Sequence, residues 1–430
     1  MFFMAYTLDD EGDLSKRPVT FCFNGGPGSS SVWLHLGAFG PRWVMMGDAG
    51  SLVGPPYHLV DNNESLLDLT DLVFIDPVTT GYSRAVKGED DSQFHGLNED
   101  IRSVAEFIRL YTTRFDRWES PKFLAGESYG TTRAAGLSGY LQDRDGMYLN
   151  GIILVSSVLH FETVSFDRGN DLPYVLFLPT YAATHWYHQN SPTIRKKSLP
   201  VWMKEARAFA EGEYASALMK GDQLSAEERE MVIGELASFT GLSPEFIDQS
   251  NLRVSIWAFT KELLRKSEKR TVGRLDSRFK GIDATARGES PDYDPSMAAI
   301  TGPYTATLNH YVRSDLEFES DLPYEILTGR VHPWNYRQYT NRYVNVADTL
   351  RSAMTKNPHL RVFVANGYYD LATPFFATEY TMNHLGLDAS LRDHVSLHYY
   401  EAGHMMYIRD ESRQKLKKEL ITYYRNTLKD

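Results

Sequence analysis

The stretch AGESYG, residues 125–130, places Ser128 between Gly126 and Gly130 in the pattern G-x-S-x-G. A run typical of a buried strand precedes this stretch, and a run typical of a helix follows it. In that context the small residues predict a strained turn that exposes the serine hydroxyl, a nucleophile elbow. A plain strand-to-helix turn is the alternative, because the pattern also recurs by chance in long chains. The chemistry predicted for Ser128 is nucleophilic attack on a carbonyl carbon.

A serine nucleophile needs a base and an acid, which hydrolases with this elbow carry after later strands. The apolar run RVFVANGYYD ends in Asp370, and VSLHYYEAGH ends in His404. This order predicts a catalytic triad in which His404 takes the proton of Ser128 and Asp370 orients the imidazole. His398 is the competing base, but the alternation of its strand predicts that it is a residue of the strand ladder.

The tetrahedral intermediate of such a reaction needs two N–H donors for its oxyanion. One donor is predicted at Tyr129, directly after the nucleophile, and the other in a loop after an earlier strand. FCFNGGPGSSS, residues 21–31, has three glycines directly after a strand-like run. Glycine lets the backbone approach a ligand closely, so Gly26 is the predicted second donor.

The elements that position these residues alternate between strand-like and helix-like runs. Residues 98–115 have helical spacing, with one apolar face formed by Ile101, Val104, Ala105, Ile108 and Tyr111. Strand-like runs on both sides predict an α/β fold with a mostly parallel central sheet and helices on both faces. Near residue 161 the alternation gives way to prolines, aromatics and several helices. We therefore divide the chain into a first core part, a mainly helical cap insertion and a second core part, at 1–160, 161–340 and 341–430.

Composition narrows the class of protein. The formal net charge of −11 argues against non-specific binding of nucleic acid. Cys22 is the single cysteine, so no intrachain disulfide forms, and its apolar neighbours predict a buried residue. No apolar run approaches the ~20 residues that span a bilayer, and the N-terminal stretch lacks the basic start of a signal peptide. A chain without membrane spans, metal or cofactor is expected; its compartment and oligomeric state are not predicted.

Four motifs in chain order, NGGPGSSS, GESYG, NGYYDLATP and EAGHMMY, resemble those of the serine carboxypeptidases, a family of the α/β-hydrolase superfamily. They run from residue 24 to residue 407, and the stretches 74–83 and 302–312 look like the bacterial branch. The resemblance implies the α/β-hydrolase fold. It also implies a serine-type carboxypeptidase that hydrolyses the C-terminal bond of peptides with a free C-terminus, through an acyl-enzyme on Ser128.

The resemblance further implies that Asn24 and Glu127 bind the α-carboxylate of the substrate. Two carboxyl groups in one site cannot both ionise cheaply, so one of them must be protonated and activity is expected at mildly acidic pH. The family pattern has a second glutamate where Ala38 stands, and a cysteine where Ser29 stands. Ala38 predicts a thinner hydrogen-bond network in the carboxylate site.

Other readings of the same residues remain open. An acyltransferase, an esterase or a lyase on this fold would carry the same triad. A non-catalytic binding protein or an inert truncated form is a further alternative, since only FFMAYTL, residues 2–8, precedes the strand that leads to the glycine loop. Met405 could line the pocket or pack in the core. The same holds for aromatic residues of the insertion, namely Tyr174, Phe177, Tyr181, Trp186 and Tyr187.

Overall fold

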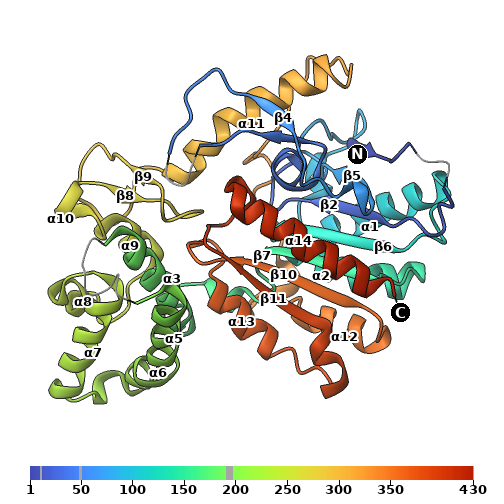
Figure 1. Cartoon of the computed structure of the whole chain (residues 1–430). Coiled ribbons are helices and arrows are strands. Elements are labelled where there is room, and N and C mark those ends of the chain that lie inside the picture. The colour runs from blue at the N-terminus through green and yellow to red at the C-terminus, as the bar shows by residue number, and fades with distance from the viewer. Residues whose placement is uncertain (10–11, 48–50, 190–196, 430) are drawn as a thin grey trace.

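The computed structural model of the chain describes residues 1–9, 12–47, 51–189 and 197–429. A seven-stranded sheet forms its centre, in the order β1-β5-β2-β6-β7-β10-β11 (Figure 1). The pair β1-β5 is antiparallel and the other five pairs are parallel, as predicted. The strands are β1 (Phe3–Tyr6), β2 (Val19–Phe23), β5 (Asp71–Ile75), β6 (Lys122–Ser128), β7 (Gly151–Ser157), β10 (Arg361–Gly367) and β11 (Val395–Tyr400).

Helices cover both faces of the sheet, because its strands carry apolar side chains on both sides. In β2, Phe21 and Phe23 join the core under α1, α2 and α12, whereas Cys22 joins the core under α14 and α11. Figure 1 shows α14 in front of the sheet, with α1 and α2 behind it. These helices are α1 (Leu97–Arg114), α2 (Tyr129–Asp145), α11 (Pro295–Ser314), α12 (Ala347–Lys356) and α14 (Asp410–Thr427).

Two local predictions are confirmed in these elements. The helix predicted over 98–115 is α1, and Ile101, Val104, Ala105, Ile108 and Tyr111 are buried on its inner face. The cysteine is also buried as predicted, with no exposed surface. Its thiol lies 3.8 Å from the carbonyl oxygen of Thr20, and burial raises its pKa, so Cys22 behaves as a small core residue.

A helical lobe stands at the lower left of Figure 1, and its hydrophobic core also includes residues 369, 371 and 375–377 near the start of α13 (Phe375–Asn383). Its helices are α3 (Leu172–His188), α5 (Leu199–Phe209), α6 (Ala215–Lys220), α7 (Ala226–Thr240), α8 (Pro244–Gln249), α9 (Ile256–Glu262) and α10 (Arg265–Glu268). Phe177 and Tyr181 are buried in this core, and Tyr174, Trp186 and Tyr187 pack against it half-buried. The aromatic residues of the lobe therefore stabilise the lobe itself.

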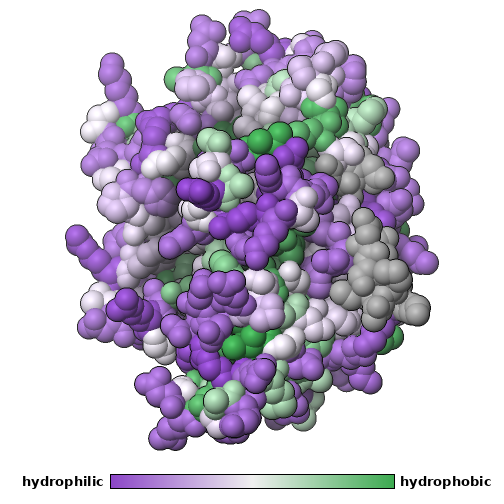
Figure 2. Space-filling model, turned by 90° about the vertical axis from the view of Figure 1, so that its left-hand side faces the viewer, coloured by the Kyte–Doolittle hydropathy of each residue, from purple (hydrophilic) through white to green (hydrophobic). Residues whose placement is uncertain are grey.

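The remaining elements are short. Two small antiparallel pairs are β3 (Arg42–Val44) with β4 (Leu59–Asp61), and β8 (Thr271–Val272) with β9 (Lys280–Gly281). Helix α13 (Phe375–Asn383) packs between the sheet and the lobe, against β10, β11 and α3. The face of the molecule that carries the lobe is mostly hydrophilic, with small apolar clusters (Figure 2). Within the described ranges, no helix combines the length and the apolar character needed to cross a bilayer.

Candidate active site

Ser128 ends β6 in a strained turn, with φ at 59° and ψ at −130°. The two glycines of the motif are required by close backbone approaches. A Cβ at Gly126 would lie 2.2 Å from the carbonyl oxygen of Gly130, and a Cβ at Gly130 would lie 2.7 Å from that of Phe23. The sequence therefore folds here into the tight turn that the motif predicts, and helix α2 starts at the next residue.

Asp370 and His404 follow β10 and β11 and lie in contact. The Nδ1 atom of His404 is 2.8 Å from Oδ2 of Asp370. The backbone N–H groups of Ala372 and Thr373 donate to Oδ1 of Asp370 at 2.8 and 3.0 Å, and the Thr373 hydroxyl donates to Oδ2 at 2.7 Å. The carboxylate is fully buried and held from both oxygens, so it fixes the orientation of the imidazole.

The charge balance around His404 favours its protonated form. Burial lowers the pKa of this imidazole, but the charge and hydrogen bond of Asp370 raise it, helped by Glu127, and the net pKa lies above its ordinary value. The competing residue, His398, lies in the β11 ladder opposite Ala365. Its Nδ1 atom is 3.4 Å from Glu419, and it does not line the cavity that contains Ser128.

The glycine loop after β2 packs directly against the elbow. A Cβ at Gly25 would lie 2.4 Å from the backbone nitrogen of Tyr129, so only glycine allows this approach. Gly26 follows with φ at 100°, a conformation that L side chains rarely adopt. Gly26 and Tyr129 line the same cavity as Ser128, as a pair of backbone donors for an oxyanion must.

Asn24 and Glu127 also line that cavity, the first with a side-chain amide and the second with a carboxyl group. Asn24 Oδ1 accepts the backbone N–H of Leu34 at 3.1 Å, while its Nδ2 is buried and has no partner in the described part of the chain. Burial raises the pKa of Glu127 to about 7, although the charge of His404, a hydrogen bond from Tyr407 and the nearby amide of Asn24 lower it in part. A buried amide donor and a readily protonated carboxyl therefore lie beside Ser128.

Ala38 lies in a buried π-helical turn, Leu34–Phe39, and supplies no polar side chain to the cavity. Glu127 instead accepts a hydrogen bond from the hydroxyl of Tyr407, with 2.5 Å between Oη and Oε2. The sequence analysis missed Tyr407, although it is the last residue of the motif EAGHMMY and follows His404 by three positions. A tyrosine three residues after the predicted base was the available signal.

The cavity around these residues has a volume of about 650 Å³. Apolar side chains from several segments form its walls, namely Trp33, Val158, Phe161, Val164, Leu275, Met297, Ile300, Leu327 and Met405. Met405 both lines this cavity and belongs to the core. Of the two alternatives left open for the aromatic residues of the insertion, core packing holds, since none of them lines this cavity; they are Tyr174, Phe177, Tyr181, Trp186 and Tyr187. They pack in the lobe because its helices must bury apolar faces against one another.

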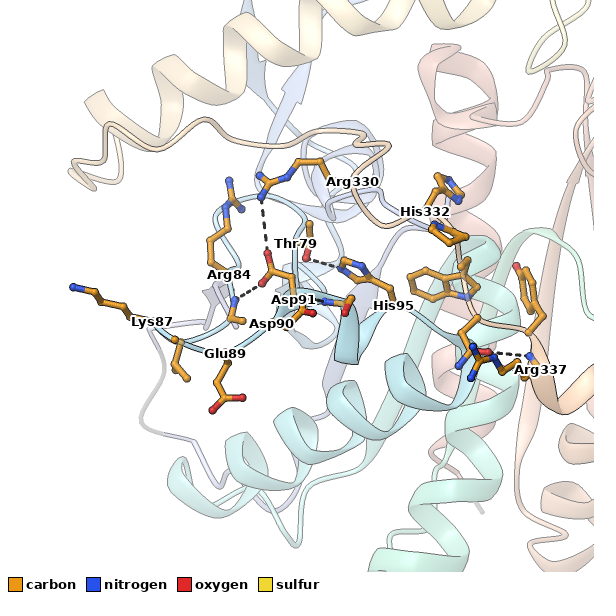
Figure 3. A pocket seen from close by; sticks show the side chains of 18 residues that line it. Thr79, Arg84, Lys87, Glu89, Asp90, Asp91, His95, Arg330, His332 and Arg337 are labelled. Carbon is orange, nitrogen blue, oxygen red and sulfur yellow. Dashed lines mark hydrogen bonds and ion pairs between the residues drawn. The ribbon is translucent and has the colours of Figure 1, made fainter.

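Figure 3 shows a second cavity, of about 1060 Å³. Both cavities are lined by His332 and Tyr336, so they adjoin. The lining of the second cavity comes from residues 84–92, 330 and 332–337, together with Thr79 and His95. Asp91 accepts the backbone N–H of Ala85 at 2.7 Å, so this acid has a local structural role. In Figure 3, Lys87 and Arg337 lie at opposite ends of the cavity.

Acidic residues that could suggest a metal site have structural partners instead. Asp71 pairs with Arg17 at 2.6 Å and with Arg117 at 2.5 Å. Asp76 accepts the backbone N–H and the hydroxyl of Ser31. Across the described ranges, no three side chains of histidine, cysteine, aspartate or glutamate gather as metal ligands would.

The chain is similar to known proteins along nearly its whole length. The family model described as serine carboxypeptidase matches residues 1–417. A carboxypeptidase Y homolog of Arthroderma benhamiae is 31% identical over 164 residues, which cover 36% of this chain and 30% of that relative's length. The crystal structure of a prohormone-processing carboxypeptidase of Saccharomyces cerevisiae superposes with a TM-score of 0.59 at 17% identity, covering 99% of this chain and 86% of that one.

These comparisons confirm the predicted fold and family. The mostly parallel sheet with its helices is the α/β-hydrolase fold. Assignment to the bacterial branch stays a prediction, because the matched family model does not separate branches. Since the family model covers nearly the whole chain, the protein belongs to the serine carboxypeptidase family.

Proposed function

We propose that this protein is a serine-type carboxypeptidase that removes C-terminal residues from peptides through an acyl-enzyme on Ser128. Family membership implies peptide substrates, and the requirement for a free C-terminus is our proposal. One observation carries it: the unpartnered amide of Asn24 and the carboxyl of Glu127, whose pKa is raised to about 7, lie beside Ser128. These groups match a substrate carboxylate, which accepts hydrogen bonds only.

The triad performs the covalent steps. Ser128 Oγ attacks the scissile carbonyl carbon while His404 Nε2 takes its proton, and Asp370 stabilises the imidazolium. His404 then donates this proton to the leaving amine, and water releases the acyl group by the same route. No hydrogen bond joins Ser128 Oγ to His404 among the described residues. This contact is expected to close when substrate binds, as catalytic hydrogen bonds often do.

The elbow after β6 and the glycine loop after β2 together bind the oxyanion and the substrate carboxylate. We assign the oxyanion to the N–H groups of Gly26 and Tyr129. Asn24 Nδ2 and the neutral carboxyl of Glu127 donate to the substrate carboxylate. An ionised Glu127 repels that carboxylate, so binding of a free acid weakens as the pH rises through about 7.

The proposal predicts a pH effect that depends on the C-terminus of the substrate. For an N-blocked dipeptide with a free acid, kcat/KM is expected to fall roughly tenfold per pH unit above the pKa of Glu127. The matching amide lacks the repelled charge and should show no such fall. In the Glu127→Gln variant the fall should disappear, because glutamine does not ionise.

The measurement is kcat/KM for both substrates from pH 5 to pH 9, with wild type and variant. Equal cleavage of acid and amide at every pH would contradict the proposal and favour an esterase or acyltransferase. Cleavage of neither substrate, with no labelling of Ser128 by a fluorophosphonate, would favour an inert form. Release of an aldehyde or ketone from a cyanohydrin, with no peptide hydrolysis, would favour a lyase.

The second cavity predicts an effect of upstream substrate residues. It meets the catalytic cavity at His332 and Tyr336, so a longer peptide can extend into it. Arg337 is exposed, lies near this junction, and has no ion pair among the described residues. Arg337→Ala is expected to lower kcat/KM about twofold to fivefold for peptides with an upstream glutamate, as loss of one exposed charge pair would.

The control for this prediction is Lys87→Ala, which removes an exposed cation at the other end of the cavity. It should leave the ratio of kcat/KM between glutamate-containing and alanine-containing peptides unchanged. The readout is that ratio, measured for peptides of two to five residues. If this ratio is the same in wild type and in both variants, the upstream residues of the substrate do not bind in the second cavity.

A further inference from the structure

Two tyrosine hydroxyls lie next to the carboxyl of Glu127, in an apolar part of the core. Tyr407 and Tyr304 have no exposed surface. A Cβ at Gly37 would lie 2.5 Å from the hydroxyl oxygen of Tyr304 and 2.5 Å from Cε2 of Tyr407, so both rings press on one backbone segment. Only one of the two hydroxyls forms a hydrogen bond, so the other tyrosine can serve as a control.

Tyr407 donates its hydroxyl proton to Glu127 Oε2 over 2.5 Å, whereas the hydroxyl of Tyr304 is buried with no hydrogen-bond partner in the described part of the chain. Burial and the nearby Glu127 raise the pKa of Tyr407 well above its ordinary value, so this residue remains a donor at every working pH. Glu127 lines the catalytic cavity, and the side chain of Asn24 is a second polar neighbour of its carboxyl.

A neutral carboxyl carries one proton on one of its two oxygens. Where a tyrosine donates to Oε2, that oxygen acts as the acceptor and the proton is placed on Oε1. Oε1 is then the donor that a substrate carboxylate needs. Without the tyrosine, the proton can occupy either oxygen, and the carboxyl can rotate.

We propose that Tyr407 is a specificity-determining positioning residue, which places the proton of Glu127 on the oxygen that faces the substrate and thereby gives the site its preference for a free C-terminal carboxylate. This inference rests on the proposed carboxypeptidase function. It assigns to Tyr407, far from Glu127 along the chain, the second polar contact of the carboxylate site.

The charged and titratable groups that face Glu127 are His404, Asp370, Tyr407 and Tyr304. Burial raises the pKa of Glu127, and the charge of His404 and the Tyr407 hydrogen bond each lower it. Removing the Tyr407 hydroxyl therefore has two consequences. The ionised form of Glu127 loses a donor, so its pKa rises further, and the neutral form loses its fixed proton position.

The test compares Tyr407→Phe with Tyr304→Phe, which removes a hydroxyl from the same neighbourhood without breaking a hydrogen bond. The substrates are an N-blocked dipeptide with a free acid and its C-terminal amide, measured from pH 5 to pH 9. For Tyr407→Phe we expect KM for the free acid to rise about tenfold at pH 5 to 6, with kcat within about threefold of wild type. The decrease of kcat/KM for the free acid with rising pH should occur about one pH unit higher than in wild type. The amide reaction of Tyr407→Phe, and all reactions of Tyr304→Phe, should stay within about twofold of wild type.

A second readout does not depend on turnover. In a Ser128→Ala background, infrared difference spectra between pH 5 and pH 9 report the carbonyl band of protonated Glu127, identified by its absence in Glu127→Gln. This titration should shift upward in Tyr407→Phe and stay unchanged in Tyr304→Phe. An unshifted titration, or an equal loss on acid and amide substrates, would overturn the role of Tyr407. If wild type shows no preference for the free acid, the proposed function fails, and the proposal for Tyr407 fails with it.

Discussion

Ser128→Ala is expected to lower kcat/KM by on the order of 10⁵-fold while leaving the fold intact. In the proposed mechanism the Oγ atom forms the acyl-enzyme, and the single thiol of the chain, Cys22, is buried in the core and cannot replace it. In serine hydrolases the residual rate without the nucleophile comes from the oxyanion hole and substrate binding alone. The strained φ of 59° at this position is no worse for alanine than for serine, so stability should change little.

The measurement is hydrolysis of a free-acid dipeptide together with labelling by a fluorophosphonate probe. Wild type should incorporate one probe per chain at Ser128, and the variant none. Ser103→Ala in α1, whose hydroxyl donates only to the Asp100 carbonyl, serves as the matched control and should keep full activity and labelling. Retention of more than about a thousandth of the wild-type kcat/KM in Ser128→Ala would show that another residue is the nucleophile.

Gly25→Ala has the second largest expected effect, because its added Cβ meets only backbone. That atom would lie 2.4 Å from the Tyr129 nitrogen and 2.8 Å from the Glu127 carbonyl oxygen. Neither can retreat without moving Ser128, which lies between them in the chain. We expect kcat to fall about 10² to 10³-fold through a displaced oxyanion donor, and the free energy of unfolding to fall by about 1–3 kcal/mol.

Active-site titration separates these two effects, since it counts the folded, competent molecules before kcat is computed. Gly234→Ala is the matched control, because this glycine lies in α7 with no atom within 4 Å of the added Cβ. Alanine there should leave kcat unchanged and raise stability by up to about 1 kcal/mol through its higher helix propensity. Full activity in Gly25→Ala would mean that the glycine loop does not position the oxyanion site.

Local sequence patterns were sufficient to predict a feature wherever the backbone conformation restricts which residues fit. The elbow at Ser128 was predictable because tight approaches admit only glycine at Gly126 and Gly130, and this requirement is visible in the sequence. Helix α1 followed from the spacing of apolar residues within a few turns. The order of Ser128, Asp370 and His404 was readable because each follows a run typical of a strand.

The sequence did not predict which strands pair or which helices pack together, because contacts between distant segments produce no periodic pattern of residues. Strand β1 precedes β2 along the chain but pairs with β5, which inserts between them in the sheet. The aromatics of α3 pack within the lobe rather than around the cavity, a choice that depends on how the lobe helices meet.

The sequence by itself determined the fold class, the family and the candidate triad, since these depend on strand–helix alternation and on short motifs with local physical causes. Only the tertiary structure decided how the carboxyl of Glu127 is held. Ala38 suggested a thinner network, but folding brings the hydroxyl of Tyr407, 280 positions away, within 2.5 Å of that carboxyl. The physical reason is that a buried carboxyl needs a hydrogen-bond partner, and any segment that the fold brings near can supply it.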